Sequence, residues 1–399
     1  MPTSVEIFAG GGGMALGTRL SGFRHAQLVE WDAAACRVLR HNASEQPELW
    51  KPDTVRETDV RAWLSEVDSL NLTEIDLVAG GPPCQPFSTG GLAAGHEDPR
   101  NMFSSAIETV RKLAPKLVLF ENVPGLLRES FKPYYEYLQN WLSRPEINPR
   151  PGELWTDHAD RIARSRTSGL RYRVYPEVIN AADLGVPQAR KRVLLIGIRS
   201  DITGAETWKK ISTSHSREEL LRSQWVTGEY WEEHCVPTSD RPETPSPRDR
   251  RTVDLLRQGQ LLPEGERWRT VRDAIKGLPT PVDGVPDDTF DSHVGIPGAR
   301  VYKGHTGSAI DAPSKTIKAG VHGVCGGEAM IRWNDDSLRY LTVRESARVQ
   351  SFPDSYQFSP LSRTSAMRVL GNAVAVDVAK EATSQLAAHI GLELDPIEI

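Results

Sequence analysis

The stretch Val5-Glu6-Ile7-Phe8-Ala9-Gly10-Gly11-Gly12-Gly13 decides the fold class of this chain. Its apolar start predicts a short strand over Val5–Ala9, and the helical pattern Met14-Ala15-Leu16 follows the glycines. Glycines let the backbone turn tightly and approach a ligand closely, and the start of a helix adds the positive end of a dipole. This order is typical of the first turn in a doubly wound nucleotide-binding domain, although a tight structural turn fits the same residues.

The same alternation of short apolar runs and helical patterns continues to about residue 199, which predicts βαβ units and a mostly parallel sheet. Further strands are expected over His25–Glu30, Asp76–Ala79, Leu117–Glu121, Arg171–Val178 and Arg192–Ile198. Helices are expected over Ala33–Asn42, around Val60–Leu70 and over Ser104–Leu113. The chain is therefore predicted to belong to the α/β class.

This rhythm is lost from about Asp201 to Pro297, a region rich in Pro, Gly, Arg and Trp. Regularity returns with a capping box from Thr342 to Glu345 and a last helix around Val376–Ile390. Because 399 residues exceed the usual size of one hydrophobic core, we expect more than one domain. The predicted division is an α/β domain made of residues 1–199 and 311–399, interrupted by a smaller irregular domain over 200–310.

Composition and cysteine spacing argue against a membrane-spanning protein and against a zinc protein. With 39% apolar and 25% charged residues, and no stretch as long as a membrane span, the chain is expected to stay in the cytoplasm. Its cysteines (Cys36, Cys84, Cys235 and Cys325) lie far apart, which argues against a zinc site and predicts no metal. The net charge of −5 neither demands nor excludes nucleic acid.

Glu30 ends the strand after the glycine turn, about 20 residues further on. An acid at this spacing suits the ribose hydroxyls of a nucleotide-like cofactor.

Cys84 lies in Gly80-Gly81-Pro82-Pro83-Cys84-Gln85-Pro86, at the carboxyl end of a predicted parallel strand, where open α/β sheets bind their ligands. A buried cysteine in a rigid turn is the ordinary alternative, but the proline frame favours a positioned nucleophile.

Two other segments carry polar groups at strand ends. Glu121 closes an apolar strand, where desolvation favours a proton-holding carboxyl, although a carboxylate that caps the next turn is the alternative. In Gln188-Ala189-Arg190-Lys191-Arg192, alternate arginines are expected to project together toward an anion or a polar ring, unless they only face solvent.

Taken in series, these segments resemble the DNA cytosine-5 methyltransferase family over about 1–199 and 310–390. The resemblance rests also on Asp59-Val60, on Asp98-Pro99-Arg100-Asn101, on Arg344–Arg348 with Phe352-Pro353-Asp354, and on Gly371-Asn372-Ala373-Val374. Two departures are small: Glu6 stands where aspartate is commoner, and Phe103 where leucine often lines the cofactor.

The resemblance implies a Rossmann-like methyltransferase fold with a target-recognition domain over 200–310, and S-adenosyl-L-methionine as cofactor. The catalytic residues that it implies are Cys84, Glu121, Arg190 and Arg192. The cofactor-binding residues that it implies are Phe8, Ala9, Gly10, Gly12, Gly13, Glu30, Trp31, Asp59, Val60, Pro82, Asn372 and Val374.

The implied reaction is covalent. Cys84 adds to C6 of a cytosine that is flipped out of double-stranded DNA, Glu121 bonds N3 and the exocyclic amine, and Arg190 bonds O2. The small, glycine-rich segment Ser88–Gly95 suits a loop that closes over DNA. The family also implies a monomeric modification enzyme, with a possible restriction endonuclease that acts on the same site.

Two arginine runs are expected to contact DNA phosphates, and base readout is expected from the insert. The runs are Arg161, Arg164, Arg166, Arg171 and Arg173, and then Arg248, Arg250 and Arg251. Three alternatives stay open: a tRNA cytosine-5 methyltransferase, a catalytically silent DNA-binding paralogue, and a dinucleotide-dependent oxidoreductase. The Cys-Phe-Thr tripeptide common in the tRNA enzymes is absent, and the oxidoreductase does not explain Pro82-Pro83-Cys84-Gln85.

Overall fold

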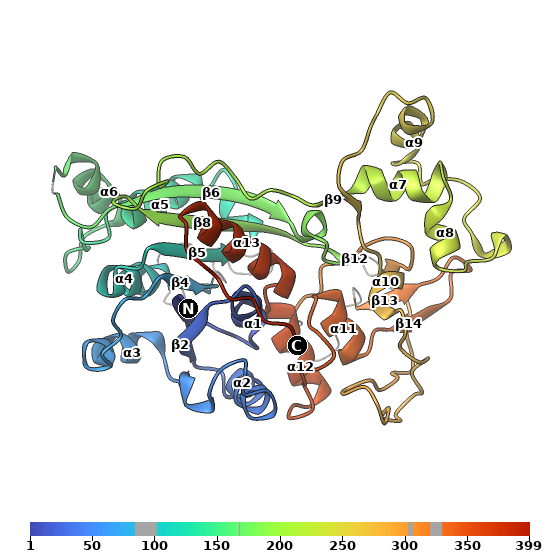
Figure 1. The fold of residues 1–399 in the computed structure, drawn as a ribbon, viewed down its shortest axis with the longest axis horizontal. Coiled ribbons are helices and arrows are strands. Elements are labelled where there is room, and N and C mark those ends of the chain that lie inside the picture. Colours follow the sequence, from blue (N-terminus) through green and yellow to red (C-terminus); the bar gives the residue numbers. More distant parts are fainter. Residues whose placement is uncertain (84–101, 167, 302–305, 320–328) are drawn as a thin grey trace. The chain divides into compact units, whose positions relative to one another are not determined.

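A computed structural model describes residues 1–83, 102–166, 168–301, 306–319 and 329–399. The chain forms two compact units (Figure 1). Unit 1 consists of residues 1–179, 191–211 and 379–398, and unit 2 of residues 180–190 and 212–378, with residue 399. The predicted recognition range 200–310 thus falls in unit 2 from residue 212 onward, and unit 2 also takes residues 311–378, which were predicted to close the α/β domain.

Unit 1 is built on a seven-stranded sheet in the order β3-β2-β1-β4-β5-β8-β6. Its strands are β1 Thr3–Ile7, β2 Arg24–Glu30, β3 Val55–Glu57, β4 Leu77–Gly80, β5 Leu117–Asn122, β6 Tyr172–Asn180 and β8 Lys191–Arg199. Strands β1 to β5 pair in parallel, and β8 runs antiparallel to β5. The predicted α/β class and mostly parallel sheet are confirmed.

The helices of unit 1 are α1 Gly13–Leu20, α2 Ala33–Glu45, α3 Val60–Glu66, α4 Phe103–Leu113, α5 Lys132–Ser143 and α6 Trp155–Arg164. Right-handed crossovers place α1 and α2 on one face of the sheet and the helices after β3 on the other. On that second face, Trp63, Ile107 and Leu138 share one buried core with strand residues such as Val5 and Val118. The sequence predicted α2, α3 and α4 but not α5 and α6.

Strand β1 ends at Ile7, two residues before the predicted end at Ala9, because the chain turns there. Phe8 has a φ of 57° and Gly10 a φ of 55°, both in the left-handed region. The glycine turn therefore begins at the carboxyl edge of the sheet, where ligands of open α/β sheets bind.

Unit 2 contains more helix than the irregular insert predicted from the sequence. Its helices are α7 Arg217–Trp225, α8 Glu229–Glu233, α9 Arg250–Arg257, α10 Val271–Ile275, α11 Val343–Val349 and α12 Arg363–Asn372. Its strands have only two or three residues: β7 Gln188–Ala189, β9 His215–Ser216, β10 Glu266–Arg267, β11 Ser308–Ala309, β12 Ser314–Lys315, β13 Met330–Arg332 and β14 Leu338–Tyr340. The predicted capping box from Thr342 to Glu345 is confirmed at the start of α11.

The last helix, α13 Val376–His389, begins in unit 2 and continues in unit 1. In unit 1 the Thr383 hydroxyl donates to the Ser21 hydroxyl just after α1, over 2.8 Å. In the described part of the chain, none of the helices combines the length and the apolar composition that a membrane crossing requires.

Candidate active site

The glycine turn leaves open space where a ligand would approach. Gly12 caps the start of α1 with a φ of 89°, and no side chain hydrogen-bonds to that helix end. A Cβ added at Gly10 would meet no atom within 4 Å, so its left-handed φ is what favours glycine there. The start of a helix beside open space forms a surface that suits an anionic or polar group.

The Glu30 carboxylate is fixed at the end of β2. One oxygen accepts from the Gly10 N–H at 2.7 Å, and the other accepts from the Trp31 and Asp32 N–H groups at 2.9 and 2.8 Å. Burial raises the pKa of Glu30, while these N–H donors oppose that shift. A carboxylate has about four lone-pair sites, so roughly one remains for a ribose hydroxyl.

The residues beside Glu30 present further groups. Trp31 is 74% exposed, which leaves its ring free to stack on a planar ligand. The Asp59 carboxylate caps α3 by accepting from the Arg61 N–H at 2.8 Å and pairs with the Arg61 guanidinium at 2.7 Å, which lowers its pKa. Val60 is buried.

A buried polar network supports α1. The His25 ring contacts the Ser4 hydroxyl at 2.9 Å through Nδ1 and the Ala15 carbonyl at 2.8 Å through Nε2. Burial lowers the pKa of His25 to about 4, so the ring is neutral near pH 7. The Nε2–H therefore donates to the Ala15 carbonyl, and the helix after the glycine turn is fixed to the sheet.

The carboxyl ends of β4 and β5 bring the predicted acid close to the predicted catalytic segment. Gly80 pairs with Phe120, and the Asn122 amide donates to the Pro82 carbonyl at 3.1 Å. A Cβ added at Gly81 would lie 3.5 Å from Oε2 of Glu121, so a glycine keeps this space open beside the acid.

Cys84 lies outside the described residues, as do Ser88–Gly95 and the segment from Asp98 to Asn101. Cys36 is buried, and burial raises the pKa of its thiol to about 12, which excludes it as a thiolate nucleophile near neutral pH.

Glu121 and Arg192 form a buried ion pair. Nε of Arg192 lies 2.5 Å from Oε1 of Glu121, and their side chains are only 12% and 11% exposed. Both residues belong to unit 1, on the neighbouring strands β5 and β8. The pair places an acid and a cation side by side at the sheet edge, near Pro82.

Arg190 has a different environment from the one predicted. It precedes β8, is buried in unit 2, and donates to the carbonyl oxygens of Ile317, Gly371 and Ala373 at 3.0, 3.2 and 2.9 Å. The expectation that Arg190 and Arg192 project together at one ring is corrected by these contacts. Arg190 instead organises the segment that contains Asn372 and Val374.

That segment, Gly371-Asn372-Ala373-Val374, is tightly packed within unit 2. A Cβ on Gly371 would lie 2.2 Å from the Ala319 nitrogen, so this position requires a glycine. Asn372 is exposed and Val374 is buried. The exposed amide is the group that this segment offers to a ligand.

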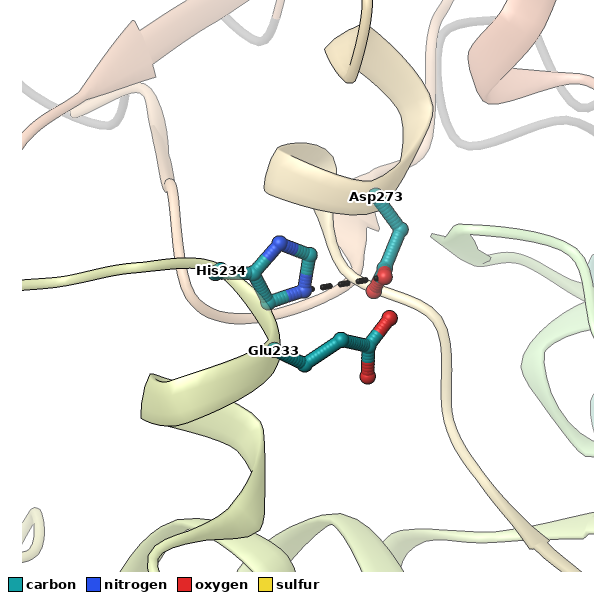
Figure 2. A group of neighbouring side chains, drawn as sticks. All are labelled: Glu233, His234 and Asp273. Atoms are coloured by element: carbon teal, nitrogen blue, oxygen red, sulfur yellow. Dashed lines mark ion pairs between the residues drawn. The ribbon is translucent and has the colours of Figure 1, made fainter.

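A second group of chemistry-bearing side chains lies in unit 2 and comprises Glu233, His234 and Asp273 (Figure 2). Nε2 of His234 lies 3.0 Å from Oδ1 of Asp273. However, the Arg267 guanidinium donates to both oxygens of Asp273 at 2.8 Å and to Glu233 at 2.7 Å. Both carboxylates already bind the Arg267 guanidinium, so these residues form a structural ion-pair network that connects the end of α8 to α10.

The two predicted arginine runs differ in their partners. In the first run, Arg161 pairs with Glu153, Arg164 with Asp160 and Arg173 with Glu206. In the second run, Arg248, Arg250 and Arg251 are all exposed. The sequence could not reveal this difference, because Glu153 and Glu206 lie outside the first run.

The sheet order, the glycine turn with its acid and the paired Glu121 and Arg192 define a Rossmann-like methyltransferase. The model of the family described as "C-5 cytosine-specific DNA methylase" matches residues 3–145 and 160–388, and the chain belongs to that family. Family membership makes the protein a DNA cytosine-5 methyltransferase.

Related proteins agree with this classification. The chain is 30% identical over 384 residues to the Type II methyltransferase M.Eco47II of Escherichia coli, covering 94% of this chain and 76% of the relative. It is 29% identical over 388 residues to M.NgoMIV of Neisseria gonorrhoeae, covering 96% of each. The structure of the S. pombe Dnmt2 methyltransferase has the same fold, with a TM-score of 0.54 at 15% identity over 97% of this chain and 99% of that one.

Proposed function

We propose that this protein transfers a methyl group from S-adenosyl-L-methionine to C5 of a cytosine in a specific double-stranded DNA sequence, as the modification enzyme of a restriction-modification system. The observation that carries the proposal is the Glu121–Arg192 pair at the sheet edge, next to the strand end that leads to Cys84. The Type II methyltransferases among its relatives support the restriction-modification role.

The cofactor site fits the residues on the same edge. We assign the ribose to Glu30, which accepts from the Gly10 N–H of the glycine turn, and a planar ring to the exposed Trp31. Phe8, Ala9, Gly10, Gly12 and Gly13 supply the turn, and Asp59, Val60, Pro82, Asn372 and Val374 complete the proposed set. When bound, S-adenosyl-L-methionine supplies an activated methyl group and leaves S-adenosyl-L-homocysteine as product.

The chain's own groups activate the cytosine ring. The Cys84 thiolate forms a bond to C6, and the C5–C6 π electrons move toward C5 while negative charge grows on N3 and O2. A proton held by Glu121 bonds N3, and its other oxygen accepts from the exocyclic amine. After C5 is methylated, the N3 proton returns to Glu121 and a water accepts the C5 proton. The electron pair of that C–H bond re-forms the C5–C6 double bond, so the Cys84–C6 bond breaks and the thiolate is restored.

We assign the O2 contact to Arg192 rather than to Arg190. The Arg192 guanidinium already lies beside Glu121, so a ring bonded to Glu121 through N3 brings O2 near the same cation. Hydrogen bonds that strengthen as charge develops lower the barrier of the covalent step. Arg190 acts as a positioning residue for the segment with Asn372.

The target base has to leave the helix, because a stacked cytosine cannot present C6 to a thiolate. We propose that the protein acts as a monomer on flipped cytosine, and that a restriction endonuclease acts on the same site without a stable complex. A tRNA substrate is the second candidate, but the absent Cys-Phe-Thr tripeptide disfavours it.

A duplex that contains 5-fluorocytosine tests the proposal, because fluorine at C5 cannot leave as a proton and the covalent adduct accumulates. We expect an adduct that depends on S-adenosyl-L-methionine with the wild type and none with Cys84→Ser. Cys235→Ser is the matched control, since that free thiol is exposed in unit 2. No adduct on a library of duplexes, or an adduct that survives Cys84→Ser, would refute the proposal.

A further inference from the structure

We infer that Arg248, Arg250 and Arg251 form a surface that binds backbone phosphates of duplex DNA outside the methylated base. We call it the α9 arginine surface, because it lies at the start of α9. The inference rests on the proposed function, since it takes duplex DNA as the substrate. It assigns the contact to this run rather than to Arg161, Arg164 and Arg173 of the first run, which pair with acids.

The three guanidinium groups are available to a partner. All three residues are exposed, and none has an acidic partner within the part of the chain that the structure describes. The intervening acid, Asp249, does not neutralise them, because it is paired with Arg217 and accepts from the Ser246 hydroxyl at 2.5 Å. The surface therefore carries about three uncompensated positive charges.

Other arginines of the same region show that pairing is the ordinary state there. Arg222 pairs with Glu219 at 2.7 Å, and Arg267 pairs with Glu233 and Asp273. Acids in this part of unit 2 thus pair with arginines, whereas Arg248, Arg250 and Arg251 have no acidic partner among the described residues. An exposed cation cluster of this kind is the electrostatic signature of a phosphate-binding surface.

The α9 arginine surface belongs to a helix whose apolar side is buried. Helix α9 buries Val253 and Leu256 in a small apolar cluster with Leu221 of α7. Proline residues at 242, 245 and 247 restrict the backbone of the segment that leads into the helix. The guanidinium groups therefore start from a restricted set of positions, which reduces the entropy lost on binding.

Two of these charges lie at the unfavourable end of the helix dipole. Arg250 and Arg251 occupy the first turn of α9, where the helix dipole is positive, no acid lies in the turn and no side chain caps the end. A bound phosphate reverses this unfavourable interaction, and its oxygens match the bidentate geometry of arginine. Phosphates of a duplex supply such groups at regular spacing, so we commit to DNA backbone as the partner.

The test is the salt dependence of DNA binding by the full chain. In Arg248→Gln/Arg250→Gln/Arg251→Gln, the slope of log affinity against log salt should fall by about 2.7, because three phosphate contacts are lost. Affinity near 0.15 M salt should fall about tenfold or more, equally on duplexes with and without the target site. Methyl transfer at saturating DNA should match the wild type, because these residues lie outside the proposed catalytic machinery.

Two further variants make the result decisive. Lysine at the same three positions keeps the charge and should keep most of the slope, which separates charge from folding. Arg161→Gln/Arg164→Gln/Arg173→Gln removes three arginines that already have acid partners and should leave the slope nearly unchanged. An unchanged slope in the first variant, with methyl transfer intact, overturns this inference alone, whereas a wild type that methylates no duplex overturns the proposed function.

Discussion

The two units position their polar groups by different means. In unit 1, the groups of the candidate site lie at strand ends, and backbone pairing of the sheet sets their spacing: Glu30 ends β2, and Glu121 lies near the end of β5. In unit 2, strands have only two or three residues, and buried arginines bind backbone carbonyls instead. The difference shows that irregular backbone needs side-chain donors where a sheet would satisfy its own carbonyls.

Arg344 is the strongest example of a buried arginine in unit 2. It is fully buried and donates to the carbonyl oxygens of Asp291, Pro353 and Tyr356 at 3.0, 3.1 and 2.9 Å. It thereby joins the loop before residue 295 to α11 and to the turn that follows it.

The largest effect is expected from Arg344→Met. It leaves these carbonyls and the Asp291 carboxylate short of donors, so the free energy of unfolding should fall by roughly 3–5 kcal/mol in urea titrations. Arg332→Met is the control, because Arg332 makes an exposed pair with Asp336 that is worth about 0.5 kcal/mol. A loss below about 1 kcal/mol for Arg344→Met would contradict the role assigned to buried arginines.

Unit 1 is expected to show the opposite behaviour: a change at a strand end should affect rate more than stability. Glu121→Gln keeps the size of the side chain but removes the carboxyl group proposed to bond N3, together with the ion pair with Arg192. Initial rates of methyl transfer should fall by roughly 10²–10³. Glu108→Gln, which removes a surface pair with Arg111 on α4, should leave the rate unchanged; an equal loss in both variants would disprove the site.

A third prediction concerns pH and the buried histidine of unit 1. The unfolded chain takes up a proton at His25 near its ordinary pKa of 6.5, whereas the folded protein does so only near 4. Between these values the unfolded state binds more protons, so the free energy of unfolding falls as pH falls, by up to roughly 3 kcal/mol.

The measurement compares urea unfolding of the wild type and of His25→Gln at pH 7.5 and 4.5. The variant should lose less stability between the two pH values, because it has no ring to titrate. Other buried groups, including Glu6, are present in both proteins and cancel in the difference. Equal losses in the two proteins would show that His25 does not carry this pH dependence.

The smallest effect is expected at Gly371 in unit 2. Alanine favours a helix over glycine by about 1 kcal/mol, but its Cβ would meet the backbone of Lys318 and Ala319. Gly371→Ala should therefore destabilise the protein by roughly 1–3 kcal/mol and raise the KM for S-adenosyl-L-methionine. Thr364→Ala, at an exposed position of the same helix, tests propensity alone; stabilisation by both variants would exclude the predicted clash.

Most of unit 1 could be predicted from the sequence because one sheet organises it. Strands β2, β4 and β5 were placed within one or two residues, since each is an apolar run that ends in a turn or a polar residue. Glu30 and Glu121 were singled out at the ends of predicted strands, and the structure places them in β2 and β5. The Gly10 N–H donor to Glu30 could not be predicted, because it depends on how the turn after β1 meets the end of β2.

The structure of unit 2 was harder to predict from the sequence, for a physical reason. In α7 the adjacent residues Leu220 and Leu221 are buried in two different small clusters, so the helix shows no single apolar stripe. The role of Arg190 was likewise hidden, because its partners at Ile317, Gly371 and Ala373 lie more than 120 residues further along the chain. When a single side chain contacts backbone groups that are distant in sequence, the hydrophobic periodicity of the sequence gives little information about those contacts.

The contact between Thr383 and Ser21 has a consequence for synthesis of the protein. These residues are 362 positions apart, yet both are buried in unit 1. A ribosome that releases the chain from its amino end exposes the region after α1 long before residues 379–398 are available to cover it. Unit 1 therefore cannot complete its packing until unit 2 has been translated, so a chain stopped within unit 2 should be a substrate for chaperones and proteases rather than a partial methyltransferase.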